Sequence, residues 1–334
     1  MAGTREHIKR IGPFILVWLV IHTFVSRPSI TQAENTKTAS PSIAILLTDH
    51  PTYREPLAVI EQRLKAKDRP YQIHTLPKGE DAKDKEKIIQ EVAGQKPNLL
   101  LTIGREATAF AAEKIPDLPM IFCMVPNAFD LPYSAKENPQ HARFAGITTD
   151  IDPKELMEWI TKAVAKPKNL VILYSARSKK TAEAFRTAGK KMDLVTTLIE
   201  TQKKDFAAAV KTLAGTGSDG VVMLPDAAIY DTPNTRHLLL WAIRSKVPVW
   251  TFSSNIVKAG ALAGQFCDMK ETGVQTAEMV EKVLAGGKVA ELGIQYAKTV
   301  KRAVNERTAE LIEVTFAPEV LKATPERYGR AQDP

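Results

Sequence analysis

Residues 98–125, NLLLTIGREATAFAAEKIPDLPMIFCMV, contain an apolar run, an alanine-rich segment and a second apolar run. The two apolar runs, 98–103 and 119–125, are short and rich in aliphatic and aromatic side chains, which is typical of strands buried on both faces. Gly104 opens the segment between them, and that segment predicts a helix to Lys114. A strand, a helix and a second strand in this order predict a parallel sheet with a crossover helix.

The same alternation extends in both directions from this stretch. Strands are expected at 42–47, 71–76, 169–174, 194–199, 220–224 and 248–252, and helices at 55–65, 83–94, 179–191, 205–213 and 232–245. The later series repeats the earlier one at a displacement of about 120 to 130 residues, with 118–122 (LPMIF) and 247–252 (VPVWTF) each closing its series. The sequence therefore predicts an α/β protein with two Rossmann-like lobes, each built on a parallel sheet.

Two extended segments, 144–150 (FAGITTD) and 261–268, fit crossings between such lobes, which would act as hinges. The expected N-terminal lobe comprises 42–145 plus 269–296, and the C-terminal lobe comprises 150–262. Closing helices within 305–325 are expected to pack on either lobe.

The first 33 residues are typical of a signal peptide. A basic start with Arg5, Lys9 and Arg10 precedes the apolar run 11–25, and Thr31-Gln32-Ala33 offers small residues for cleavage near Ala33. The apolar run is shorter than the roughly 20 residues of a membrane-spanning helix. We expect export to the periplasm, with an uncleaved N-terminal anchor as the alternative.

Charge and cysteine content limit the class of partner. Removal of the leader leaves 42 Lys and Arg against 37 Asp and Glu, a net charge of +5. These charges are scattered over predicted helices and do not form a basic stripe with aromatics, so we expect no nucleic-acid partner. Cys123 and Cys267 could form one disulfide in an oxidising compartment, or each could be a small buried hydrophobic residue.

Motifs of catalysis and cofactor binding are missing from the sequence. The match Gly215-Thr-Gly217-Ser-Asp-Gly220 follows a predicted helix and precedes a predicted strand, which is the reverse of a dinucleotide-binding motif. The six histidines are scattered, and no nucleophile elbow or metal-ligand spacing occurs. We expect neither an enzyme nor a bound metal or cofactor.

Open parallel sheets bind ligands beyond the carboxyl ends of their strands. Polar residues that follow the predicted strands are therefore the candidate ligand contacts, although a Ser, Thr or Asp at such a place is also a common helix N-cap. In the first lobe the candidates are Thr48, Asp49, His50, Gly104, Arg105, Glu106 and Asn127; in the second they are Tyr174, Asp226, Ser253, Ser254 and Asn255. Asp226 precedes two alanines, and we expect it to accept a hydrogen bond from a ligand ammonium. Asp268 at the second crossing is the alternative residue for this role.

The sequence resembles the ABC transporter substrate-binding proteins of the group that includes tryptophan- and tyrosine-binding members, a branch of the type I periplasmic binding fold. The matching motifs are 146–155 (GITTDIDPKE), 169–174 (NLVILY), 247–254, 258–263 (KAGALA), 273–279 and 305–321. Two regions depart from the family pattern: residues 125–141, and Asp226-Ala227-Ala228, where relatives often carry an Asp-Asn pair.

The resemblance implies a monomeric periplasmic protein that captures a small polar ligand between its lobes by hinge closure. An amino acid is the ligand class that the family suggests, and the partner would be the ABC permease of the inner membrane. The alternative is a periplasmic sensory subunit that reports ligand binding to a membrane signalling protein.

Overall fold

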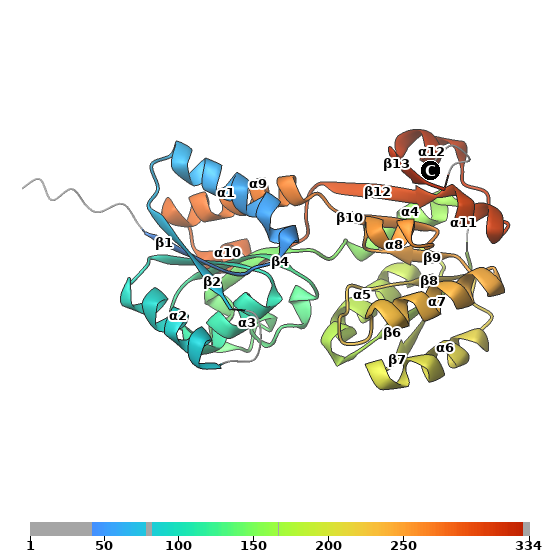
Figure 1. Ribbon diagram of the computed structural model, residues 1–334, viewed down its shortest axis with the longest axis horizontal. Coiled ribbons are helices and arrows are strands. Elements are labelled where there is room, and N and C mark those ends of the chain that lie inside the picture. Colours follow the sequence, from blue (N-terminus) through green and yellow to red (C-terminus); the bar gives the residue numbers. More distant parts are fainter. Residues whose placement is uncertain (1–41, 78–81, 166, 330–334) are drawn as a thin grey trace, which may run out of the picture. The chain divides into compact units, whose positions relative to one another are not determined.

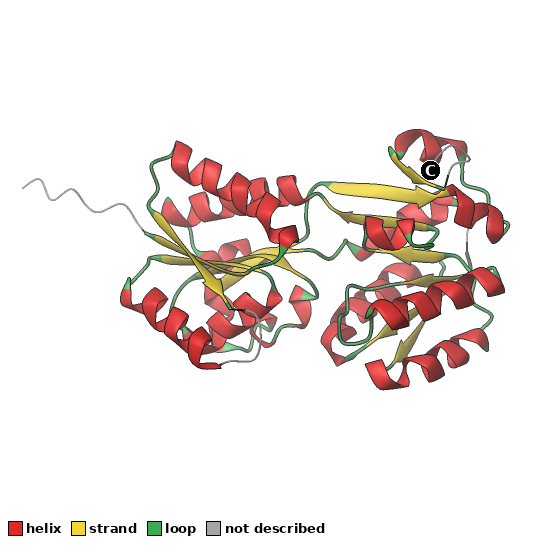
Figure 2. Cartoon of the chain, in the orientation of Figure 1, coloured by secondary structure: helices red, strands yellow, loops and turns green. Residues whose placement is uncertain are grey.

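The computed structural model describes residues 42–77, 82–165 and 167–329, all within one compact unit of the chain (Figure 1). The predicted signal peptide, 1–33, and its cleavage site lie outside the described residues. Two separate sheets, each covered by helices on both faces, confirm the predicted fold class (Figure 2). Within the described segments, no helix combines the length and the hydropathy that a membrane span requires.

The first sheet has six parallel strands in the order β11-β5-β4-β3-β1-β2. Its strands are β1 (Ile43–Thr48), β2 (Tyr71–Leu76), β3 (Leu99–Ile103), β4 (Met120–Val125), β5 (Phe144–Thr148) and β11 (Ile294–Gln295). The helices beside it are α1 (Arg54–Ala66), α2 (Ala82–Gly94), α3 (Arg105–Lys114), α9 (Met269–Leu284) and α10 (Val289–Leu292).

Alternating side chains of β1 show why this sheet is covered on both faces. Ile43 and Ile45 belong to the buried cluster that includes side chains of α1 and α9, whereas Ala44 and Leu46 belong to the cluster with α2 and α3. Successive side chains of a strand point to opposite faces, so an uninterrupted apolar strand requires an apolar layer on each side.

The second sheet has seven strands in the order β13-β12-β10-β9-β8-β6-β7. They are β6 (Asn169–Tyr174), β7 (Val195–Glu200), β8 (Gly220–Val222), β9 (Val249–Thr251), β10 (Ala263–Cys267), β12 (Val300–Asn305) and β13 (Glu326–Tyr328). Its helices are α4 (Pro153–Ala163), α5 (Lys179–Lys190), α6 (Phe206–Ala214), α7 (Thr232–Ser245), α8 (Ser254–Lys258), α11 (Glu306–Leu311) and α12 (Pro318–Ala323).

The tail of the chain completes this second sheet. β12 pairs antiparallel with β10, and β13 pairs parallel with β12, so one antiparallel pair interrupts an otherwise parallel sheet. Val320 of α12 is buried in the same cluster as Trp250 of β9. The closing helices thus pack on the second lobe, whereas the sequence had allowed packing on either lobe.

The chain passes between the sheets at three places: after β5, after β10 and before β12. Glu155 at the start of α4 links the strands near them, because its Oε1 accepts hydrogen bonds from Gln265 Nε2 of β10 at 2.7 Å and from Arg302 Nη2 of β12 at 3.3 Å. Gly146 in β5 is required by close approach, since a Cβ there would collide with the Phe122 carbonyl oxygen.

The two cysteines are free and buried, so the structure contains the second of the two alternatives that the sequence left open. Cys123 lies in β4 and Cys267 ends β10, and both belong to the apolar cluster between the first sheet and α9. Burial raises the pKa of the Cys123 thiol to about 12 and that of the Cys267 thiol to about 11. Neither thiol is therefore ionised at neutral pH.

We predict that neither cysteine reacts with a water-soluble disulfide reagent while the protein is folded, because the thiolate is the reactive form and both sulfurs are buried. The measurement is the release of chromophore from such a reagent, before and after unfolding in urea. Two thiols should appear on unfolding. Fast reaction of either thiol in the native protein would contradict the prediction.

Candidate functional site

The carboxyl ends of β3 and β4 are joined by the guanidinium of Arg105, the first residue of α3. Its Nη1 donates to the carbonyl oxygens of Pro126 at 2.8 Å and of Asn127 at 3.2 Å. Two bonds from one planar group fix the direction of the loop that leaves β4. Asn127 has a left-handed backbone (φ 50°), which asparagine tolerates better than most residues.

A tyrosine covers the end of β3. Gly104 has φ 92°, and a Cβ at this position would collide with the Tyr53 hydroxyl. The ring of Tyr53 lies 5.2 Å from that of His50, whose Nδ1 accepts from the Thr52 amide at 3.3 Å. Gly104 therefore serves two purposes: it adopts the positive φ before α3, and it leaves room for Tyr53 over the strand ends.

Asp150, just after β5, accepts a hydrogen bond from the same loop. Its Oδ1 accepts from the Asn127 amide at 2.9 Å, and its Oδ2 accepts from the Thr148 hydroxyl at 2.7 Å. The residue is 3% exposed, and this burial raises the pKa of its carboxyl group to about 6, although the hydrogen bonds from Asn127 and Thr148 act in the opposite direction.

We predict that Asp150→Asn removes a pH-dependent part of the stability. Because the folded pKa of about 6 exceeds the ordinary value of 3.8, the folded state binds the proton more tightly than the unfolded chain. The contribution of Asp150 to stability is then full below about pH 4 and is lost as the pH rises through 6, by about 3 kcal/mol. Urea unfolding at several pH values measures it: the wild type should gain on the variant between pH 7 and pH 4. A constant difference would contradict this.

In the second lobe, the carboxylate of Asp226 anchors the loop that follows β6. Its Oδ2 accepts from the Ser175 amide at 3.0 Å, the Ser175 hydroxyl at 2.6 Å and the Ser178 hydroxyl at 2.5 Å. Its Oδ1 accepts from the Ala228 amide at 2.9 Å. The residue is 2% exposed, so its four protein donors replace the water that a buried carboxylate loses.

We predict that Asp226→Ala lowers the free energy of unfolding by about 3 kcal/mol, because it leaves several buried donors without an acceptor. Ser178→Ala is the matched control: it removes one donor and keeps the acceptor, and it should cost about 1 kcal/mol. Urea denaturation measures both. Equal effects of the two substitutions would show that Asp226 is not the centre of this network.

Direct hydrogen bonds join the loops of the two lobes. Asn127 Nδ2 donates to the Pro225 carbonyl oxygen at 2.9 Å. The carboxylate of Asp130 accepts from the first turn of α5: the Lys180 amide at 2.6 Å, the Thr181 amide at 3.1 Å and the Thr181 hydroxyl at 2.9 Å. A carboxylate from the first lobe therefore caps a helix of the second, where free amides favour a negative charge.

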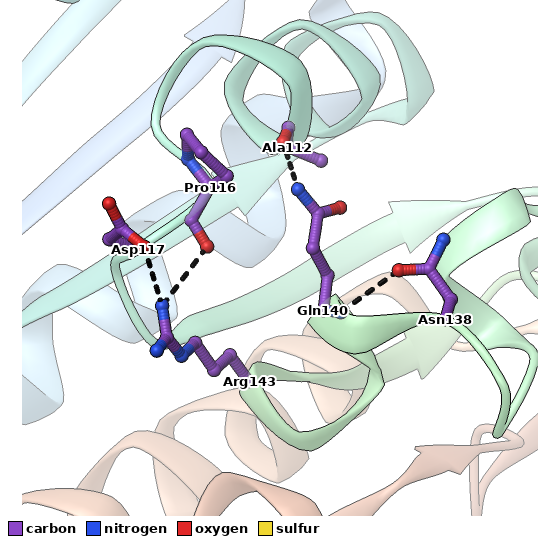
Figure 3. A network of polar contacts seen from close by, with 6 residues as sticks. All are labelled: Ala112, Pro116, Asp117, Asn138, Gln140 and Arg143. Carbon is purple, nitrogen blue, oxygen red and sulfur yellow. Dashed lines mark hydrogen bonds and ion pairs between the residues drawn. The ribbon is translucent and has the colours of Figure 1, made fainter.

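A hollow of about 690 Å³ opens beside these loops. It is lined by α3, by the segment 131–140 and, from the second lobe, by Arg177. Figure 3 shows what holds the segment: Gln140 Nε2 donates to the Ala112 carbonyl oxygen of α3 at 2.9 Å, and Arg143 Nη1 donates to Asp117 at 2.9 Å. Between β4 and β5 the chain forms three short 3-10 turns, at Ala128–Asp130, Pro132–Ser134 and Pro139–Arg143.

Several residues that the sequence singled out have other partners in the fold. Thr48 ends β1, and Asp49 lies 4.0 Å from Arg54. Glu106 is exposed and pairs with Lys85 at 2.6 Å. The Tyr174 hydroxyl donates to Glu200 at 3.3 Å.

The predicted residues of the last strands lie around α8 and α9. Ser253 precedes α8, and the Ser254 hydroxyl donates to Glu326 of β13. Asn255 is exposed at a second hollow, between α7 and α8. Asp268 caps α9 by accepting from the Lys270 amide at 2.9 Å, and it pairs with Lys301 at 3.1 Å.

Of the predicted residues, the structure brings Arg105, Asn127 and Asp226 into one chain of loop contacts. The sequence reasoning missed Tyr53, Asp130, Tyr133, Arg177 and Ser178. Arg177 and Ser178 follow β6 within four residues, so the rule that selected Tyr174 at the end of this strand could have found them. Among the described residues, no group of three or more His, Cys, Asp or Glu side chains is arranged to hold a metal ion.

Residues 43–327 match the family model of the ABC transporter substrate binding proteins. No curated protein matches the chain.

Solved structures share the fold at low identity. An ABC domain in complex with L-Trp from Streptococcus pneumonia is 20% identical, with 86% of this chain and 99% of that chain covered and a TM-score of 0.64. A ligand-free, open substrate-binding protein with adhesive properties from Clostridium difficile is 17% identical, with 87% of this chain and 100% of that chain covered and a TM-score of 0.67. A periplasmic ribose ABC transporter from Conexibacter woesei is 11% identical, with 82% of this chain and 95% of that chain covered and a TM-score of 0.51.

Proposed function

Because this chain belongs to the ABC transporter substrate-binding protein family, we propose that it captures a small polar ligand between its two lobes and delivers it to an ABC importer. The proposed cellular place is the periplasm, reached by a signal peptide cleaved near Ala33, and the proposed form is a monomer without catalytic activity. The partner is the permease of the inner membrane.

One observation carries the proposal. The loops that leave the carboxyl ends of the strands in both sheets meet, through Asn127 to Pro225 and through Asp130 to Thr181. This is the edge at which open parallel sheets bind ligands, and here two such edges contribute to one place. A ligand bound there would contact both lobes at once.

Hinge closure follows from that arrangement. A ligand that contacts both lobes binds the closed state more tightly than the open one and shifts the population toward it. The three connections between the sheets are the natural hinge, and Glu155 ties their neighbouring strands together. The permease would then recognise the closed state.

An amino acid is the ligand class we propose first, since the pneumococcal relative was solved with L-Trp. Arg105 and Asn127 would shape the first-lobe wall. Asp226 would act by holding Ser175 and Ser178, which flank Arg177, because its own oxygens already accept four hydrogen bonds.

We predict that the protein from Glu34 onward shows a ligand-dependent rise in melting temperature in a screen of amino acids, sugars, nucleosides and small carboxylates. Calorimetry of each hit gives the dissociation constant, and small-angle scattering should show a smaller radius of gyration with ligand.

If no compound of the four classes binds, or if a compound binds without reducing the radius of gyration, ligand capture by closure is contradicted. Importer and sensor differ in the next step: the loaded protein should stimulate ATP hydrolysis by the permease in inner-membrane vesicles. Ligand binding without that stimulation would favour a sensory subunit.

A further inference from the structure

The hollow of about 690 Å³ contains two arginines, one from each lobe. Arg105 begins α3, at the end of β3, and Arg177 lies in the turn after β6. Neither forms an ion pair with any carboxylate in the parts of the chain that the structure describes. The charges of Asp130 and Asp150 act on Arg105 through space, but neither carboxylate forms an ion pair with it.

The acidic side chains around the hollow have partners other than the two arginines. Glu106 pairs with Lys85 at 2.6 Å, and Glu113 lies 3.4 Å from Lys114. The carboxylate of Asp130 already accepts from the first turn of α5. Each of these acids therefore has its own donor or cation, and none of them forms an ion pair with either arginine.

A buried hydroxyl adds an independent observation. Tyr133 lines the hollow, is 7% exposed, and its hydroxyl has no hydrogen-bond partner among the described residues. A buried polar group without a partner costs free energy, and it is rare in native proteins unless a ligand or water completes it. The Tyr133 ring packs edge-on against Phe144, with 4.3 Å between the ring centroids, and Gln140 of the same segment donates to the Ala112 carbonyl oxygen of α3 (Figure 3).

The electrostatics of Arg105 agree with this placement. Burial, and then the charge of Arg177, lower the pKa of the Arg105 guanidinium. Burial raises the pKa of the Tyr133 hydroxyl to about 12, and the nearby charge of Arg105 acts against that rise. The charges of Asp130 and Asp150 act on the Arg105 pKa in the opposite direction, and the two arginines repel each other.

We propose that this hollow is an anion site, in which a carboxylate or phosphate group of the ligand binds Arg105 and the Tyr133 hydroxyl of the first lobe together with Arg177 of the second. Guanidinium groups pair with the oxygens of both anions in the same planar geometry. An anion held by both lobes offsets the repulsion between the arginines, so it favours closure, whereas a neutral ligand of the same shape leaves the repulsion in place. The proposal rests on the proposed ligand-binding function and specifies the charge of its ligand.

The first experiment uses inorganic phosphate and succinate as probes on the protein from Glu34 onward, with sodium chloride at equal ionic strength and neutral succinamide as controls. Calorimetry and melting temperature should show binding of at least one anion and no binding of succinamide. Phosphate alone indicates a phosphorylated ligand, and succinate alone indicates a carboxylate. If neither anion exceeds sodium chloride, the proposal is wrong.

Variants locate the site. Arg177→Gln should weaken anion binding about tenfold, because Arg177 is exposed and its loss leaves the fold intact. Tyr133→Phe should weaken it about threefold by removing one hydrogen bond. The matched control is Arg186→Gln, which removes one charge from an exposed arginine of the same lobe that pairs with Glu183 outside the hollow. Equal weakening by Arg177→Gln and Arg186→Gln would reduce the effect to net charge and overturn the site.

The outcomes separate this proposal from the function on which it rests. If an uncharged compound binds and compacts the protein while phosphate and succinate do not bind, ligand capture stands and the anion site falls. If the anions bind through Arg177 but no compound compacts the protein, the anion site stands and capture by hinge closure falls.

Discussion

Burial of each sheet on both faces is the constraint on which the rest of the structure depends. β4 is apolar in every position, and β1 and β3 each have one threonine among apolar side chains, so each strand needs a layer of helices above and below. Parallel strands joined by crossover helices bring all strand carboxyl ends to one edge. The loops at that edge carry the polar residues of the candidate site.

Buried carboxylates then determine how those loops are shaped. Asp150 holds the loop after β4 by the Asn127 amide, and Asp226 holds the loop after β6 by Ser175 and Ser178. A carboxylate removed from water must regain its hydrogen bonds from the protein, so each one collects several donors from different segments. The two loops that they hold carry Asn127 and Arg177, one in each lobe.

The rule that ligand contacts follow strands led to segments of the candidate site. It did not show which side-chain atoms already have hydrogen-bond partners within the protein. Asp226 was selected for a ligand ammonium, yet the structure gives its oxygens four protein donors. Ser254 was selected because its hydroxyl could contact a ligand, but that hydroxyl donates to Glu326, which lies 72 residues further along the chain. Such partners cannot be found from spacing, because a loop's hydrogen bonds depend on neighbours from other elements.

The sequence by itself determined the two α/β lobes and the limits of most strands and helices, because apolar periodicity records which face of each element is buried. Motifs such as 146–155 and 258–263 indicated the family. It also indicated Arg105 and Asn127 through the ends of their strands. Only the tertiary structure decided that Tyr133 and Arg177 lie at the same hollow as Arg105, and that α12 and β13 complete the second lobe. Tyr133 belongs to a segment without any period. Its ring packs against Phe144, and Gln140 and Arg143 further along form hydrogen bonds to residues about 26 to 28 positions away. Local pattern therefore specifies the layers, and contacts between distant loops specify the site.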